Sequence, residues 1–280
     1  MLRSIWETTS WQSAQTPTLS YKCMDPFEYT QFLDSVHRGA PIEKNFEVIF
    51  GGSSIHSLPF IDLYKECMEE SKTSVGDWKV FRRALRALNL AKYYDYALNL
   101  EGEKAECGVL HGFSALMLAK IHQAANPEYS GLGFHLVDSF AGLSEPTEKD
   151  ALGYRETTLG KRQPIYSHNQ GHFANSQGNV RKVMQDFPNI AYHEGWIPDI
   201  LESLPEAKWS FVHIDVDLYA PTYACLEYFV PRLSDGGVIV NDDFSSPLFP
   251  GGGVGWAEYC QQNNLHYVVL DSGQAIYIKG

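Results

Sequence analysis

The sequence contains no run of about 18 apolar residues, so no membrane-spanning helix is expected. Its first residues lack the apolar segment of a secretory signal. The five cysteines are an odd number, lie far apart and include no Cys-x-x-Cys pair, which argues against a disulfide framework and against a zinc site. These absences predict a cytoplasmic protein with reduced thiols.

Positive charge is scarce as well. The chain carries 22 Lys and Arg residues against 34 Asp and Glu residues, and its formal net charge is -12. Nucleic acids and anionic membrane surfaces are polyanions, so neither is an expected partner. With 280 residues, of which 44% are hydrophobic, the chain can form one large α/β domain with an N-terminal extension, or two small domains.

From residue 78 onward, short apolar runs alternate with helical patterns. The stretch 78–100 repeats apolar residues at intervals of three and four, which predicts a helix with one apolar face. Further helices are expected at 114–124 and 222–233, strands at 104–109, 133–138, 190–194, 209–217 and 237–242, and a closing antiparallel pair at 266–270 and 274–279. The alternation predicts βαβ units and a mostly parallel sheet, whose ligands bind beyond the carboxyl ends of the strands.

Two segments fall outside this rhythm. Residues 1–77 contain scattered prolines and a turn-like stretch at 51–54, and we interpret them as an N-terminal cap with a helix near 60–70. Residues 145–177 are polar and rich in Gly, His, Asn and Gln. A loop of this length inside a compact domain is usually a lid or a disordered insert, and the lid is the preferred interpretation.

A glycine motif follows the expected strand at 104–109 and opens the next helix. It reads Glu106-x-Gly108-x-x-x-Gly112, with Ser114 behind it. Glycines at this place let the backbone turn tightly and approach a ligand, and a helix N-terminus offers unpaired N–H groups to a carboxylate. The spacing differs from the dinucleotide pattern Gly-x-Gly-x-x-Gly. By itself the motif is also compatible with a plain strand-to-helix turn.

Asp138 ends the next expected strand, 26 residues after Gly112. An acid at this place can accept hydrogen bonds from both hydroxyls of a nucleoside ribose. The alternative is a solvated loop acid with no ligand. The preceding glycine motif favours the ribose.

Four carboxylates are expected at two neighbouring strand ends. Asp215 and Asp217 are two residues apart at the end of the strand at 209–217, so they would share one face, and Asp242 and Asp243 end the strand at 237–242. Four such acids repel one another unless protons or a cation neutralise them. Oxygen ligands suit Mg²⁺, Mn²⁺ or Ca²⁺. The alternative is that one or two of them cap the following helices, Asp217 above all.

Two histidines lie near these motifs. His213 is inside the expected strand at 209–217 and is interpreted as a satisfied core residue. His111 lies in the glycine loop, close to the expected cofactor pocket, and is a candidate catalytic residue. Trp196 follows the strand at 190–194, where its ring could stack on an adenine or simply pack against the protein.

Taken in order, these segments resemble the macrocin O-methyltransferase (TylF-like) family of class I methyltransferases. The matching strings are ECGVLHGFS, VDSFAGLSEP, GHFANSQGNVRKVMQDFPNIAYHEGWIPDILESLP and VHIDVDLYAPTYACLEYFVPRLSDGGVIVNDDF. The resemblance covers roughly residues 78–260. The combination of DSFAGL, GWIPD, IDVDLY and the Asp-Asp pair is specific, whereas any one of them alone is not.

The resemblance implies a Rossmann-like class I methyltransferase domain at residues 78–280, with a mostly parallel seven-stranded sheet and helices on both faces. It implies S-adenosylmethionine as the methyl donor and methylation of a hydroxyl assisted by Mg²⁺ (or Mn²⁺/Ca²⁺). The acceptor is expected to be a small molecule, a sugar or another intermediate of secondary metabolism. Relatives of this kind often form a homodimer or a higher homo-oligomer.

The resemblance also assigns roles to residues at the strand ends. The cofactor-binding residues would be Glu106, Gly108, Gly112 and Ser114 at the methionine end, Asp138 and Ser139 at the ribose, Gly195 and Trp196 on the adenine side, and Asp215. The metal ligands would be Asp215, Asp242 and Asp243. The general base would be Asp215 or Asp217. The acceptor pocket is expected to be built from the parts that resemble the family least, namely the lid, the N-terminal cap and the glycine-rich segment 251–255.

Other functions remain open at this point. One is an N-methyltransferase, or an enzyme of the same fold that uses S-adenosylmethionine for a different reaction. Another is a non-catalytic cofactor-binding protein, against which the intact acidic residues argue. The third is a nicotinamide-dependent oxidoreductase, against which the glycine spacing and the carboxylates argue.

Overall fold

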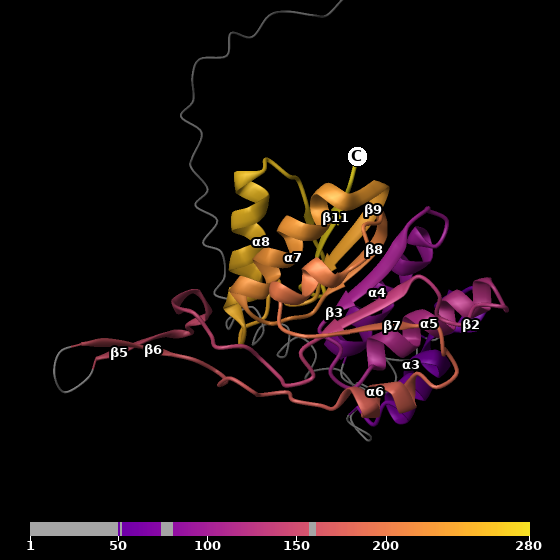
Figure 1. Ribbon diagram of the computed structural model, residues 1–280, viewed down its shortest axis with the longest axis horizontal. Helices are drawn as coiled ribbons and strands as arrows, with labels where there is room; N and C mark the ends of the chain where they lie inside the picture. Colours follow the sequence, from indigo (N-terminus) through magenta and orange to yellow (C-terminus); the bar gives the residue numbers. More distant parts are fainter. Residues whose placement is uncertain (1–49, 51, 74–80, 157–160) are drawn as a thin grey trace, which may run out of the picture.

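The computed structural model describes residues 50, 52–73, 81–156 and 161–280. Its centre is a seven-stranded sheet with helices against both faces (Figure 1). The strands of this sheet are β3 (Glu103–Cys107), β4 (Phe134–Asp138), β7 (Ala191–Glu194), β8 (Trp209–Ile214), β9 (Leu233–Asn241), β10 (Val268–Val269) and β11 (Ala275–Ile278). The α-helices are α3 (Phe60–Glu70), α4 (Phe81–Ala97), α5 (Phe113–Ala125), α6 (Gln177–Val183), α7 (Tyr219–Phe229) and α8 (Pro250–Gln262). Two hairpins, β1 (Ser54–Ile55) with β2 (Leu58–Pro59) and β5 (Gly153–Glu156) with β6 (Arg162–Ile165), and the 3₁₀ helices η1 (Glu148–Asp150), η2 (Asp199–Ser203) and η3 (Val230–Arg232) complete the described elements.

The order in which the chain adds strands reverses at the centre of the sheet, although the central strands are parallel. Neighbouring strands follow the order β10-β11-β9-β8-β3-β4-β7. The strands from β9 to β7 pair in parallel, whereas β11 pairs antiparallel with both β9 and β10. The chain runs from β3 outward to β4 and β7 and then returns to β8 on the other side of β3. Such a switch point opens a crevice at the carboxyl ends of β3 and β8, where α/β proteins bind ligands.

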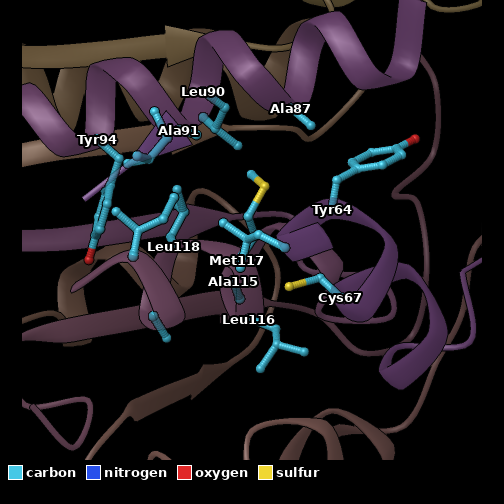
Figure 2. Packing of buried hydrophobic residues seen from close by; sticks show 14 of the residues in the cluster. Tyr64, Cys67, Ala87, Leu90, Ala91, Tyr94, Ala115, Leu116, Met117 and Leu118 are labelled. Carbon is cyan, nitrogen blue, oxygen red and sulfur yellow. The ribbon is translucent and has the colours of Figure 1, made fainter. Parts of the chain in front are cut away.

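The central strands are apolar on both faces because helices cover both of them. On one face, α3, α4 and α5 form a packed layer that Figure 2 shows from close by, with Leu90 and Tyr94 of α4 near Met117 and Leu118 of α5. Tyr94 also meets Phe211 of β8 edge-on, with ring centroids 5.0 Å apart. This face therefore ties α4 directly to the strand that carries the candidate site.

The opposite face of the sheet is covered by α7 and α8. Trp209 of β8 and Phe229 of α7 pack edge-on at a centroid distance of 5.1 Å, and Trp256 of α8 belongs to the same buried cluster. Side chains alternate along a strand, and Val212 and Ile214 belong to this second cluster. His213 therefore points towards α4.

The predicted mostly parallel, Rossmann-like α/β fold is confirmed, with shifted element ends. The expected helix at 60–70 is α3, and the one expected at 78–100 is α4, of which residues 78–80 lie outside the described part. The strand expected at 209–217 ends at Ile214. The expectation that Asp215 and Asp217 share one face of this strand was therefore wrong, because both follow its end and Asp217 has a left-handed backbone with φ 62°.

The glycine-rich segment 251–255, predicted to help build the acceptor pocket, forms the first turns of α8 and is absent from the lining of the cavity at the carboxyl ends of the central strands. Its glycines are needed for close packing. A Cβ added to Gly251 would lie 1.7 Å from Oδ1 of Asp150, and one added to Gly253 would lie 2.1 Å from the carbonyl oxygen of Phe244. Tight contact of α8 with its neighbours thus outweighs the poor helix propensity of glycine.

The two flanking segments are described in part. Residues 1–49, 51 and 74–77 of the predicted N-terminal cap lie outside the described residues, and within the rest Tyr64 of α3 packs on Phe113 of α5 at a centroid distance of 5.6 Å. The predicted lid at 145–177 contains η1 and the hairpin β5–β6, which projects from the body of the molecule (Figure 1). Of the helices described here, none is long and apolar enough to cross a bilayer.

Candidate active site

A cavity of about 630 Å³ opens at the carboxyl ends of the central strands, a volume typical of small-molecule sites. Its wall is formed by the loops after β3, β4, β7, β8 and β9 and by one face of α4. The predicted site residues on this wall are Gly108, His111, Ser114, Asp138, Ser139, Gly195, Trp196, Asp215, Asp217, Asp242 and Asp243. Glu106 and Gly112 are outside the lining of the cavity, and their neighbours in the motif form it.

The loop between β3 and α5 depends on glycine for its shape. Gly108 has φ 86°, and a Cβ added to it would lie only 1.8 Å from the carbonyl oxygen of Asp215. The loops after β3 and β8 therefore meet in backbone contact, as the hydrogen bond from Asp215 N to Cys107 O at 2.8 Å also shows. This contact brings the glycine motif and the first aspartate to one side of the cavity.

Glu106 is buried beneath this loop with 0% exposure. Its Oε1 accepts a hydrogen bond from Oγ of Ser114 at 2.7 Å, and its Oε2 has no hydrogen-bond partner in the described chain. His213 lies beside it in the register of β3 and β8, with Nδ1 3.6 Å from that Oε2. A buried carboxylate with one satisfied oxygen is costly unless a further donor or a cation completes it.

Asp138 accepts hydrogen bonds from the backbone of two loops that line the cavity, the loop after β3 and the loop after β4. Its Oδ2 accepts from Val109 N at 2.6 Å, and its Oδ1 accepts from Phe140 N at 2.7 Å. Ser139 donates to the carbonyl oxygen of Gly142 at 2.8 Å. The predicted ribose acid is thus fixed at the edge of the cavity by the glycine loop, and Gly195 and Trp196 after β7 stand on the adjoining wall.

Three potential metal ligands lie close together at the carboxyl ends of β8 and β9. One ligand atom each from His213, Asp215 and Asp242 lies within 4.8 Å of the others. His213 is 1% exposed, and within the described part of the chain neither of its ring nitrogens has a hydrogen-bond partner. The predicted core position of His213 is confirmed, whereas the prediction that its ring nitrogens are satisfied was wrong, because the sequence does not show which groups lie opposite β8.

Asp217 and Asp243 stand beside this group and are linked to each other. The backbone N–H of Asp217 donates to Oδ2 of Asp243 at 2.9 Å. Burial and the neighbouring charge of Asp215 raise the pKa of Asp217 well above its usual range. The pKa of Asp243 is raised in the same direction by burial and by the charges of Asp217 and Asp215. The predicted crowding of four acids in one cleft is confirmed.

Arg86 of α4 supplies positive charge to this cluster. Its Nη2 forms an ion pair with Oδ2 of Asp242, donates to the carbonyl oxygen of Asp242 at 2.8 Å, and lies 3.7 Å from Oδ1 of Asp243. Gln274 of the β10–β11 turn donates to the other carboxylate oxygen of Asp242 at 2.6 Å. The end of β9 is therefore held by contacts from two separate elements.

The donor set fits a divalent cation. Carboxylate oxygens suit Mg²⁺, Mn²⁺ or Ca²⁺, and an imidazole nitrogen without a hydrogen-bond partner can serve as a further ligand. A cation at this place would also lower the repulsion that raises the pKa of Asp217 and Asp243. The predicted ligand set was Asp215, Asp242 and Asp243, and the compact group contains His213 in place of Asp243.

Sequence reasoning missed the arginines of α4. Arg82, Arg83 and Arg86 all line the cavity, together with Ala87 and Leu90 of the same helix. The pattern at 78–100 was used only for its apolar face. The missed signal is three arginines within five residues of a chain with net charge -12.

A family model described as macrocin-O-methyltransferase (TylF) matches residues 73–272. Among curated proteins, the chain is 26% identical over 148 residues to an 8-demethyl-8-(2,3-dimethoxy-alpha-L-rhamnosyl)-tetracenomycin-C 4'-O-methyltransferase of Streptomyces olivaceus, covering 51% of this chain and 53% of that protein. It is 25% identical over 150 residues to demethyldecarbamoylnovobiocin O-methyltransferase of Streptomyces niveus, covering 52% and 54%. The chain spans about half the length of these two curated relatives.

Solved structures agree on the fold. The calicheamicin methyltransferase CalS11 aligns with a TM-score of 0.57 at 20% identity, covering 78% of this chain and 92% of that one. The O-methyltransferase NovP aligns with a TM-score of 0.57 at 20% identity, covering 77% and 88%. With the family model spanning the glycine motif, the acidic strand ends and the segment between them, the chain belongs to the macrocin O-methyltransferase (TylF) family.

Proposed function

We propose that this protein transfers a methyl group from S-adenosylmethionine to a hydroxyl of a small molecule, with the help of a divalent metal. The observation that carries the proposal is the single cavity that joins the glycine loop after β3 to the acidic cluster after β8 and β9. One half of this cavity suits a nucleoside cofactor and the other half suits a metal-assisted reaction at oxygen. Membership of the TylF family supports the same activity.

The cofactor would lie across the switch point of the sheet. Phe113 and Ser114 at the start of α5 line the cavity, and the N–H groups of this helix N-terminus would bind the methionine carboxylate. Asp138 and Ser139 would hold the ribose, and Trp196 would lie against the adenine. S-adenosylmethionine supplies an electrophilic methyl group on a positively charged sulfur.

The acidic cluster would handle the acceptor hydroxyl. Asp215 and Asp242 would hold the metal with His213 or Asp243, and a divalent ion at this place supplies Lewis acidity that lowers the pKa of a nearby hydroxyl. Asp217 lies outside the compact three-residue group but lines the same cavity, so we assign it the role of proton acceptor, with Asp215 as the alternative. His111 is exposed on the rim and would contact the acceptor.

The acceptor is proposed to be a sugar hydroxyl of a secondary metabolite or of its precursor. The name of one curated relative contains a rhamnosyl group on tetracenomycin C, which supports a sugar hydroxyl as the acceptor. Another relative, 23% identical over 191 residues, is the mycinamicin III 3''-O-methyltransferase of Micromonospora griseorubida. A cavity of about 630 Å³ has room for a cofactor together with part of an acceptor.

Calorimetry with S-adenosylhomocysteine, with and without Mg²⁺, tests the cofactor. Micromolar or tighter binding supports the proposal, and absence of binding under both conditions contradicts it. A panel of glycosylated small molecules is then assayed for S-adenosylhomocysteine formed in step with methylated product. Tight binding of NAD(H) in place of S-adenosylhomocysteine would favour an oxidoreductase.

A further inference from the structure

One face of α4 brings a row of arginine side chains to the cavity. Arg82 and Arg83 lie in the first turn of α4 and Arg86 lies one turn further on, and all three line the same space as the acidic cluster. The four aspartates of the acidic cluster, Asp215, Asp217, Asp242 and Asp243, also line that space. An acceptor that enters it therefore meets negative charge after β8 and β9 and positive charge along α4.

The three arginines differ in what they contact. Arg86 is already paired, because it forms an ion pair with Asp242 at the end of β9. Arg82 donates to the carbonyl oxygens of Ser272 and Ser245, both at 3.2 Å. Arg83 is different, because its Nη1 is buried and has no hydrogen-bond partner in the described chain. No carboxylate of the described residues forms an ion pair with Arg83.

A guanidinium in this situation is costly for the folded protein. Arginine stays charged at all relevant pH values, so burial cannot be relieved by loss of a proton. A buried charge is normally paired, and a planar guanidinium pairs best with a carboxylate or phosphate through two parallel hydrogen bonds. Arg83 is therefore a charged group in the cavity wall for which the described residues provide no counter-ion.

We propose that Arg83 binds an anionic group, phosphate or carboxylate, carried by the methyl acceptor. The inference rests on the proposed function and specifies its acceptor: a sugar or related small molecule that bears negative charge. Arg83 lies three residues before Arg86, a rise of about 4.5 Å along the helix. Because Arg86 contacts Asp242, one small molecule can place its anionic group at Arg83 and its hydroxyl at the acidic cluster. The charge of Arg83 also offsets the repulsion that four aspartates would exert on an anion.

The test uses three probes of similar size: glucose 1-phosphate, glucuronate and uncharged glucose. Each is titrated into the full-length protein, saturated with S-adenosylhomocysteine and kept in metal-free buffer. Wild type is expected to bind at least one anion in preference to glucose. Arg83→Gln should weaken that binding by about 10- to 100-fold, the size expected for a charge-assisted hydrogen bond, and leave glucose unchanged. Which of the two anions binds more tightly identifies the acceptor as a phosphate or a carboxylate.

Two further variants separate recognition from structure. Arg83→Lys keeps the charge without the planar fork and should retain part of the affinity. Arg232→Gln, which removes a surface arginine that donates to Tyr228 O outside the cavity, should bind anions as wild type does. The melting temperature of Arg83→Gln should equal or exceed that of wild type, because a charged group with a buried nitrogen that lacks a hydrogen-bond partner is removed; a structural role would lower it.

The proposal is overturned if the affinity of wild type for glucose equals or exceeds its affinity for each of the two anions. It is also overturned if Arg83→Gln binds the anions with wild-type affinity. The anion titrations are repeated without S-adenosylhomocysteine. If wild type fails to bind S-adenosylhomocysteine, the proposed function is contradicted. If wild type binds S-adenosylhomocysteine but does not prefer the anions to glucose, only the role of Arg83 is contradicted.

Discussion

Arg86 is bonded to Asp242 twice, through the carboxylate and through the backbone carbonyl oxygen, which lies 2.8 Å from Nη2. A helix on one face of the sheet thereby neutralises part of an acidic cluster at the end of β9. The same carboxylate is one of the three groups that converge within 4.8 Å. Arg86 therefore stands in for part of the positive charge that a metal would bring.

We expect Arg86→Met to lower stability in metal-free buffer by roughly 2 kcal/mol, less than the loss of a fully buried pair because Arg86 is partly exposed. Without the guanidinium, the aspartates repel one another and attract a divalent ion more strongly. Mg²⁺ should therefore raise the melting temperature of Arg86→Met by more than it raises that of wild type. Thermal unfolding with and without Mg²⁺ measures both effects.

The control for this experiment is Lys149→Met, which breaks the ion pair with Glu258 on α8, away from the cluster. It should show the wild-type response to Mg²⁺. An equal Mg²⁺ response in Arg86→Met and wild type would mean that Arg86 and the metal do not compete for the same carboxylates.

Asp242→Asn should reduce methyl transfer by about 100-fold or more, because a proposed metal ligand loses its charge. The cofactor half of the cavity is built by other strands, so affinity for S-adenosylhomocysteine should stay within about twofold of wild type. Calorimetry and product formation measure the two quantities separately. Asp235→Asn changes an aspartate of the same strand whose side chain is 92% exposed, and it should leave both unchanged. Full activity of Asp242→Asn in metal-free buffer would exclude the metal role.

Gly108→Ala should destabilise the protein by about 3 kcal/mol or more, from a strained backbone and from overpacking. The residue has φ 86°, and the added Cβ would come within 1.8 Å of the carbonyl oxygen of Asp215. Urea unfolding measures the loss, and calorimetry should show weakened binding of S-adenosylhomocysteine. Gly153→Ala is the matched control, since nothing lies within 4 Å of a Cβ added there. Wild-type stability of Gly108→Ala would show that the two loops can separate at no cost.

The parts of the fold that local pattern decides were predictable. Alternating apolar runs located β3, β4, β7, β8 and β9, and the acids were expected where they are, because parallel strands end at one edge. The start of α7 was not predictable, since Asp150 accepts a hydrogen bond from Tyr219 N at 2.7 Å across 69 positions of sequence. The glycines of α8 were misjudged for a similar reason. These glycines are explained by the backbone and side chains that pack closely against them, and helix propensity carries no information about such contacts.

The candidate site follows the same division. Asp215, Asp242 and Asp243 stand out in sequence because a carboxylate at a strand end has few structural uses. His213 and Arg86 do not stand out, since a histidine in a strand and an arginine in a helix are ordinary. Their importance appears only when β8 and α4 are packed together and the pairing of each polar atom can be followed.

His122 should make the stability of the protein depend on pH. It stacks on Tyr129 at a ring distance of 3.5 Å, and its Nδ1 is hydrogen-bonded to the hydroxyl of Tyr94 at 3.2 Å. Burial, with a smaller contribution from the charge of Lys104, lowers the pKa of His122 from 6.5 to about 4. Between these two values the unfolded chain binds a proton that the folded protein does not, so stability falls as pH decreases from 6.5 towards 4 and is unaffected by this group at higher pH.

The contribution of His122 is at most about 3 kcal/mol and is smaller in practice, because the ring is partly exposed. His122→Gln should flatten the pH dependence of the free energy of unfolding, measured by urea titration between pH 7 and pH 4. His266→Gln, at an exposed position on the surface, should leave that slope as in wild type. An unchanged slope in His122→Gln would show that the ring is protonated in the folded protein, and that its stacking on Tyr129 persists in the charged form.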